Sequence, residues 1–171
     1  MKSSQKPFCS SIFLFCLLVA VASLSTQTLA GIGWYVTIYN ESSSDLNISS
    51  AGNDNWYCND FCGPKTVKAG QSHTFYTEVH GEDTAIQGIN MNGVHVEFYT
   101  SGHAHTGTEI VSKTLYAPHC VVDEGCHCGE EGPTAISTSN TQAISATLDS
   151  GSDSSCPGSF GTVQAGVHYH P

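Results

Sequence analysis

Apolar and polar residues alternate along short segments of the chain after residue 30, and this alternation predicts strands. In Trp34–Tyr39, the residues Trp34, Val36 and Ile38 fall on one face, a period of two that is typical of a half-buried strand. The opposite face of that strand carries Tyr35, Thr37 and Tyr39.

A turn follows this first strand. The polar run Asn40–Asp45 has the composition of a turn, and Leu46 and Ile48 resume the alternation beyond it. We therefore expect the first two strands to form a hairpin.

Further strands with the same pattern are expected downstream. They are Ser72–Val79, Val94–Thr100, Glu109–Tyr116, Gln142–Leu148 and Phe160–Val167. No segment after residue 30 sustains the apolar stripe of an amphipathic helix. Short strands separated by loops rich in glycine, serine, asparagine and aspartate predict an all-β fold, an antiparallel β-sandwich, as a single domain over residues 31–171.

One connection differs from the other loops. The segment Ala117–Pro133 combines three cysteines with four acidic residues and several glycines and prolines. We interpret it as an acidic surface loop tied by disulfides.

The first thirty residues have the pattern of a secretory signal peptide. Lys2 and Lys6 precede the apolar run Ile12–Ala22, and the small residue Ala30 suits cleavage before Gly31. The apolar run is too short for a membrane anchor, which needs roughly 20 residues. The mature protein, residues 31–171, is therefore expected to be secreted and to have no transmembrane segment.

The charge balance narrows the range of partners. The chain carries 15 acidic residues against 5 basic ones, for a formal charge of −10, and it has no arginine. Nucleic acid is excluded as a partner because neutralising phosphates requires lysine and arginine. Anionic membranes are disfavoured for the same reason, and neutral lipid or sugar headgroups fit better.

Cysteine usage agrees with export. Six cysteines remain after the leader: Cys58, Cys62, Cys120, Cys126, Cys128 and Cys156. An even number in a secreted chain predicts three disulfides, although the sequence does not choose among the possible pairings. The alternative is a zinc site built from Cys120, Cys126 and Cys128 with His119 or His127. The spacing of these cysteines is not that of the usual paired zinc-binding motifs.

Motifs with a catalytic mechanism are missing from the sequence. It has no nucleophile elbow, no HExxH pair, no phosphate-binding loop and no dinucleotide fingerprint. We therefore expect a protein that acts by binding and is not an enzyme.

Histidines form two closely spaced pairs, His103 with His105 and His168 with His170. On an extended backbone, side chains two residues apart lie on one face and can share a copper or zinc ion. An extracellular metal-binding protein is therefore an alternative function, with these four histidines as ligands if the two segments meet. The simpler alternative is that they are solvated histidines, and a pH sensor is a third.

Two glycosylation sequons flank the first expected turn, at Asn40 and Asn47. In a eukaryotic secretory pathway, either asparagine is a candidate for carrying a glycan.

Aromatic residues offer candidates for recognition. Trp56 and Tyr57 lie in a polar stretch next to Cys58 and Cys62, where rings on a braced loop suit stacking on a sugar or contact with a membrane surface. The alternative places Trp56 in the core at the end of the sandwich. Tyr99, on the polar face of its expected strand, is added as a third contact residue.

Parts of the chain resemble aegerolysins. The segment Gly33–Asn40 with Asp45–Ile48 is similar to their first hairpin, Lys68–Gln71 looks like a strand-initiating turn, and Gly158–Val163 looks like their closing strand. The resemblance implies a small acidic β-sandwich that binds particular membrane lipids. Together with the residues above, it favours a secreted, disulfide-bonded protein that recognises a surface lipid or glycan, with membrane activity as part of what the resemblance implies. A secreted structural or host-interaction protein is a further alternative.

Overall fold

The computed structural model describes residues 33–80, 85–100, 105–121, 125–150 and 162–171; for residues 115–121, 125–133 and 150 it describes only the backbone. The expected leader, residues 1–30, lies outside the described residues, as do His103 and Cys156.

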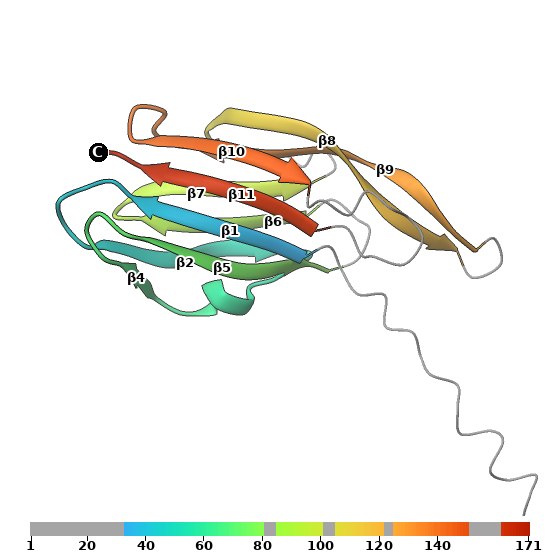
Figure 1. Cartoon of the computed structure of the whole chain (residues 1–171), viewed down its shortest axis with the longest axis horizontal. Coiled ribbons are helices and arrows are strands. Elements are labelled where there is room, and N and C mark those ends of the chain that lie inside the picture. Colours follow the sequence, from blue (N-terminus) through green and yellow to red (C-terminus); the bar gives the residue numbers. More distant parts are fainter. Residues whose placement is uncertain (1–32, 81–84, 101–104, 122–124, 151–161) are drawn as a thin grey trace, which may run out of the picture.

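Eleven strands form two packed sheets in the described residues, which confirms the all-β sandwich (Figure 1). The first sheet has the strand order β10-β11-β1-β5-β3, and the second has the order β4-β2-β6-β7-β9-β8. The bounds are β1 Gly33–Asn40, β2 Leu46–Asp54, β3 Trp56–Tyr57, β4 Lys65–Val67, β5 Ser72–Val79, β6 Ala85–Met91, β7 Val94–Thr100, β8 Thr108–Val121, β9 Gly125–Thr138, β10 Ile144–Ser150 and β11 Thr162–Tyr169. The described residues contain no helix long and apolar enough to cross a bilayer.

The connection between β1 and β2 is not the hairpin expected from the sequence. β1 lies in the first sheet and β2 in the second, so the chain crosses from one layer to the other between Asn40 and Leu46. The prediction was wrong because alternation fixes which side chains face inward but leaves open which sheet a strand joins.

The sandwich also contains one parallel pair. β1 pairs in parallel with β11, from Gly33 opposite Thr162 to Asn40 opposite Tyr169, while the remaining strand pairs are antiparallel. The expected sandwich is therefore antiparallel in most of its pairs, with its first and last strands side by side.

The segment expected to be a surface loop, Ala117–Pro133, is largely strand. Its backbone continues β8 and β9 as a paired hairpin, which extends past the ends of the neighbouring strands (Figure 1). The expectation was wrong because glycine, proline and acidic residues do not prevent pairing in a two-stranded ribbon whose outer edges are free.

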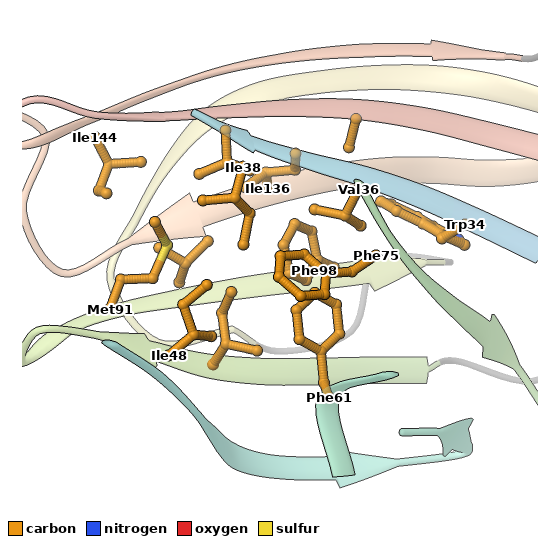
Figure 2. Close-up of a cluster of buried hydrophobic side chains, with 14 of the residues drawn as sticks. Trp34, Val36, Ile38, Ile48, Phe61, Phe75, Met91, Phe98, Ile136 and Ile144 are labelled. Carbon is orange, nitrogen blue, oxygen red and sulfur yellow. The ribbon is translucent and has the colours of Figure 1, made fainter. Parts of the chain in front are cut away.

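The core lies between the two sheets and takes large apolar side chains from both (Figure 2). Trp34, Val36 and Ile38 of β1 are fully buried, as the alternation predicts. Trp34 packs edge-on against Phe98 of β7, with 5.8 Å between ring centroids, so the two layers are in direct contact. Burial of such side chains stabilises the fold by about 1.5–3 kcal/mol each.

A disulfide closes the short helical turn Asn59–Cys62 that follows β3. Cys58 is bonded to Cys62, and Phe61 between them is buried against Phe75 of β5, with 5.2 Å between ring centroids. One cystine is thus present among the described side chains, and the pairing of the other four cysteines stays a prediction.

Candidate functional site

The outer face of the first sheet carries an ordered array of polar and aromatic side chains. Every second residue of its strands points away from the core, and the strand register places these residues in rows across the sheet. Successive rows over β10, β11, β1 and β5 contain Ser145, His168, Tyr39 and Ser72; then Thr147, Gly166, Thr37 and Thr74; then Asp149, Gln164, Tyr35 and Tyr76.

The middle row forms the floor of a trough. It consists of three threonines and Gly166, with the hydroxyls of Thr37 and Thr74 hydrogen-bonded at 2.9 Å. A Cβ at Gly166 would lie 2.7 Å from Oγ1 of Thr147, so the glycine leaves space that a side chain would fill. The trough has a volume of about 420 Å³ and is lined by Tyr35, Thr37, Tyr39, Thr74, Thr147, Asp149, Gln164, Ala165 and Gly166.

One wall of the trough is an aromatic stack. The rings of Tyr39 and His168 are nearly parallel, at an interplanar angle of 9° and with 4.3 Å between centroids. Nδ1 of His168 lies 2.5 Å from Oε1 of Glu41, which fixes the imidazole from its outer side. The stack therefore presents a preformed wall.

Tyr35 forms the opposite wall and packs against Tyr76. The rings of Tyr35 and Tyr76 lie 5.2 Å apart at 55°, and the Tyr76 hydroxyl donates a hydrogen bond to Oε2 of Glu78 at 3.0 Å. Burial, assisted by this bond to a carboxylate, raises the pKa of Tyr76 to about 12. The phenol therefore stays protonated and keeps its orientation through the neutral range.

An amide and a carboxylate stand at the end of the trough near β10. Gln164 is opposite Asp149 in the register, and both line the trough. Asp149 forms an ion pair with Lys113 of β8, which bridges from the second sheet. These groups add hydrogen-bonding capacity beside the tyrosine wall.

The trough can stack against flat apolar surfaces and hydrogen-bond to hydroxyl groups. Its walls offer ring faces, because Tyr35 is 45% and Tyr39 is 37% exposed, and its floor and end offer hydroxyl, amide and carboxylate groups. The charged groups on or beside it are Asp149, Glu41 and Glu78, with Lys113 as a cation, so the surface is acidic.

Of the two adjacent aromatic candidates from the sequence, Trp56 is not available for recognition. It is 4% exposed, packs on Trp34 with 5.1 Å between ring centroids, and donates its Nε1 hydrogen to Oγ1 of Thr77 at 2.8 Å. Its polar sequence neighbours suggested an exposed ring, but Thr77 supplies a buried partner for the indole nitrogen. Tyr57 is 47% exposed, as expected for a contact residue.

Tyr99 is also buried, at 2% exposure, which contradicts its expected role in surface contact. Its hydroxyl donates to Oε2 of Glu109 at 2.6 Å, and the ring of His105 stacks over it with 4.6 Å between centroids. Burial, together with the Glu109 carboxylate, raises the pKa of Tyr99. It was placed correctly on the outer side of β7 but is covered by the chain that follows the strand.

Glu97 is the neighbouring carboxyl on β7 and is buried as well. Oε1 lies 2.8 Å from Nε2 of His95 and accepts from the Thr106 hydroxyl at 2.7 Å, and Oε2 accepts from the Thr106 amide at 2.6 Å. Burial by itself raises the pKa of Glu97, but these hydrogen bonds outweigh burial and hold it below its usual value. Glu97 thus fastens the segment after β7 to the second sheet.

The histidine pairs do not meet in the described part of the chain. His168 lies in β11 of the first sheet, and His170 follows that strand, with its Nε2 3.2 Å from the Ser145 hydroxyl. His105 instead stacks on Tyr99 of β7 in the second sheet. Among the described residues, no group of three or more His, Cys, Asp or Glu side chains is placed to hold a metal ion. The condition set for the metal-binding alternative, that the two segments meet, is therefore not fulfilled by His105, which packs on the second sheet, while His168 and His170 lie at the first.

The two sequons differ in accessibility. Asn40 is 1% exposed, and its Nδ2 donates hydrogen bonds to the carbonyls of Ser44 at 2.8 Å and Val67 at 3.0 Å. A glycan on this nitrogen is incompatible with the fold, so Asn40 is corrected to a structural residue. Asn47 lies exposed on β2, as the sequence predicted for both.

The residues of the trough were not identified from the sequence as a site. The signal for three of the nine lining residues was present, since the alternation placed Tyr35, Thr37 and Tyr39 on the outward face of the first strand. Gly166 and Thr147 gave no such signal, because their role depends on the pairing of β10 and β11 with β1.

Comparisons with known proteins add little to this geometry. No family model matches the chain, and no curated protein matches it. Among solved structures, IP-1A from Alcaligenes faecalis is similar with a TM-score of 0.40 and 8% sequence identity, over 84% of this chain and 95% of that one. A similarity at this level carries no functional argument.

Proposed function

We propose that the protein binds a neutral carbohydrate in the trough on the outer face of the first sheet. The observation that supports this most is the combination of two aromatic walls with a floor of hydroxyl groups around Gly166. Sugar rings have apolar C–H faces and polar edges, and therefore need both kinds of contact at once.

The chemistry of the trough assigns a role to each group. Tyr35 and Tyr39 offer their exposed faces for stacking, while the hydroxyls of the floor and the Gln164 amide exchange hydrogen bonds with sugar hydroxyls. Asp149 accepts hydrogen bonds only, which suits a ligand rich in donors.

Charge argues against acidic ligands. Three carboxylates stand on or beside the trough, and Lys113 is already paired with Asp149. Phosphate, sulfate or sialic acid would be repelled there, so the proposed ligand is uncharged.

A glycan fits this surface better than the hydrocarbon of a membrane. The exposed large hydrophobic residues of the described chain are Tyr35, Tyr39 and Tyr57, and all of them are tyrosines. Penetration into a bilayer relies on protruding aliphatic and tryptophan side chains, which this face does not present. Lipid recognition, as implied by the aegerolysin resemblance, is accordingly the competing outcome of the test.

The test is a glycan array followed by calorimetry, with liposomes of neutral and sphingolipid composition in parallel. We expect retention of neutral glycans and about tenfold weaker binding by Tyr35→Ala, which removes one stacking face. Thr108→Ala, an exposed strand residue on the second sheet, is the matched control and should bind like the unmodified protein. Binding to liposomes without binding to any glycan would refute the proposal.

A further inference from the structure

Three exposed tyrosines share one face of the molecule. Tyr35 and Tyr39 both point away from the core on β1. Tyr57 on β3 is opposite Glu78, which also points away from the core on β5. Its neighbour Trp56 is opposite Val79, and both are buried, so Tyr57 points to the same side as the trough. Among the described residues these three are the large hydrophobic side chains that are most exposed.

Tyr57 is held in place by its surroundings. Its ring packs edge-on against His80, with 4.7 Å between centroids. The next residue, Cys58, begins the disulfide-closed turn, and Asp60 within that turn accepts the backbone amide of Tyr76 at 2.7 Å. The turn is therefore fastened to β5, the strand that carries Thr74 of the trough floor and Tyr76 beside Tyr35.

The distances between the three tyrosines exceed the length of a single sugar ring. Tyr39 and Tyr35 are four residues apart on one strand, about 13 Å at the rise of a β-strand. Tyr57 lies two strands away from β1, level with Gly33, which puts it about 12 Å beyond Tyr35. One sugar ring stacks on one aromatic ring, so contact with all three requires a chain of several sugars.

We propose that the binding face accepts an extended neutral oligosaccharide, running diagonally from the Tyr39 wall across Tyr35 and Tyr76 to Tyr57. This inference rests on the proposed function and adds to it the class of ligand: an internal stretch of a glycan chain instead of a terminal sugar. Glu78 lies between Tyr76 and Tyr57 along this path, and its Oε2 accepts a hydrogen bond from the Tyr76 hydroxyl.

Among the described residues, the row across the sheet from β1 to Tyr57 carries a glycine on β1. Gly33 lies in the row beyond Tyr35, and the Tyr76 ring extends over it: a Cβ at Gly33 would lie 3.0 Å from Cε2 of Tyr76. The glycine leaves the space that the Tyr76 ring occupies, so that this ring lies between Tyr35 and β3.

The test measures how the affinity of the protein, residues 31–171, depends on the length of the oligosaccharide. Chito-oligosaccharides and cello-oligosaccharides from dimer to hexamer are titrated by calorimetry into the unmodified protein, Tyr57→Ala and Tyr57→Phe. We expect affinity to rise with length in the unmodified protein, and Tyr57→Ala to bind the longest oligomers about tenfold more weakly while binding the shortest ones unchanged. Tyr57→Phe keeps the ring and should retain most of the gain with length.

The outcomes separate the two proposals. Binding of short oligomers with no gain in affinity for longer ones, or equal affinities of Tyr57→Ala and the unmodified protein at every length, would overturn the extended site and leave the trough standing. If the unmodified protein binds no neutral oligomer of either series and no glycan on the array, both proposals fail. Melting temperatures of the variants, expected to be unchanged for this exposed residue, show that they are folded.

Discussion

The side-chain amide of Asn40 donates a hydrogen bond to the backbone carbonyl of Val67 at 3.0 Å and thereby joins the end of β1 to β4 in the opposite sheet. The same nitrogen donates to the Ser44 carbonyl, and Oδ1 accepts from the amide and hydroxyl of Ser42. A single buried side chain therefore fixes the crossing from the first sheet to the second.

Asn40→Asp should destabilise the protein by about 1–3 kcal/mol, because a carboxylate cannot donate to the two carbonyls and the buried hydrogen bond to the Val67 carbonyl is lost. Denaturant unfolding measures the change. Asn47→Asp, the same substitution at an exposed position on β2, is the control and should have little effect. Equal stability of the two variants would show that the Asn40 contacts do not hold the crossing.

Expression with residues 1–30, the expected leader, in eukaryotic secretory cells should give a glycan on Asn47 and none on Asn40. Asn47 and Ser49 are both exposed and line a depression of about 280 Å³ with Pro64 and Asn92, on the second sheet and away from the trough. Intact mass before and after enzymatic deglycosylation measures occupancy. Ser49→Thr keeps the sequon and should keep the glycan, whereas Ser49→Ala should lose it. Secreted protein with a glycan on Asn40 would contradict the fold described for β1.

Glu97→Gln should lower the free energy of unfolding by about 1–3 kcal/mol at neutral pH, because the amide replaces an acceptor that serves His95 and Thr106. The pKa of Glu97 is lower in the folded state than in the unfolded state. Its contribution is therefore complete above the unfolded value, about 4.3, and is lost as the pH falls through the folded value.

The difference in stability between the unmodified protein and Glu97→Gln should accordingly shrink below about pH 4. Asp54→Asn, at an exposed carboxyl on β2, provides the comparison and should change stability little at any pH. A difference for Glu97→Gln that is the same at acid and neutral pH would mean that the carboxylate charge is not what fastens Thr106.

Replacing Cys58 and Cys62 together by alanine should cost about 2 kcal/mol, at the low end for native disulfides because the loop they close is short. The loss should be visible as a lower melting temperature under non-reducing conditions, and reductant should remove the difference from the unmodified protein. A thiol assay on the denatured mature protein should find no free cysteine, since the remaining four are expected to be paired. Free thiols in that assay would refute the expectation of three disulfides.

Much of the fold could be read from local patterns. The expected strands Ser72–Val79 and Val94–Thr100 coincide with β5 and β7, because large apolar residues alternate there with polar ones. β6 was missed, since Gln87 interrupts its inward face. Gln87 is buried because its Nε2 donates to the carbonyls of Gly52 and Gly88, partners that no local pattern reveals.

The site was less accessible to sequence analysis than the fold. Alternation placed Tyr35 and Tyr39 outward, but their neighbours on the trough come from β5, β10 and β11, and register between distant strands is not encoded locally. Trp56 was misplaced for a related reason, because its polar neighbours in sequence say nothing about Thr77, its partner in space. The sequence therefore predicted the orientation of residues within one strand, such as Tyr35 and Tyr39. It did not predict contacts that depend on how several strands pair.

The parallel pairing of β1 with β11 has a consequence for how the protein matures. β1 can pair with β5 early in synthesis, but its other neighbour, β11, follows all the other strands in the chain, so the first sheet and the trough are completed only after Thr162–Tyr169 has been made. Truncation before Thr162 would remove β11 and with it Gln164, Ala165 and Gly166 from the lining of the trough.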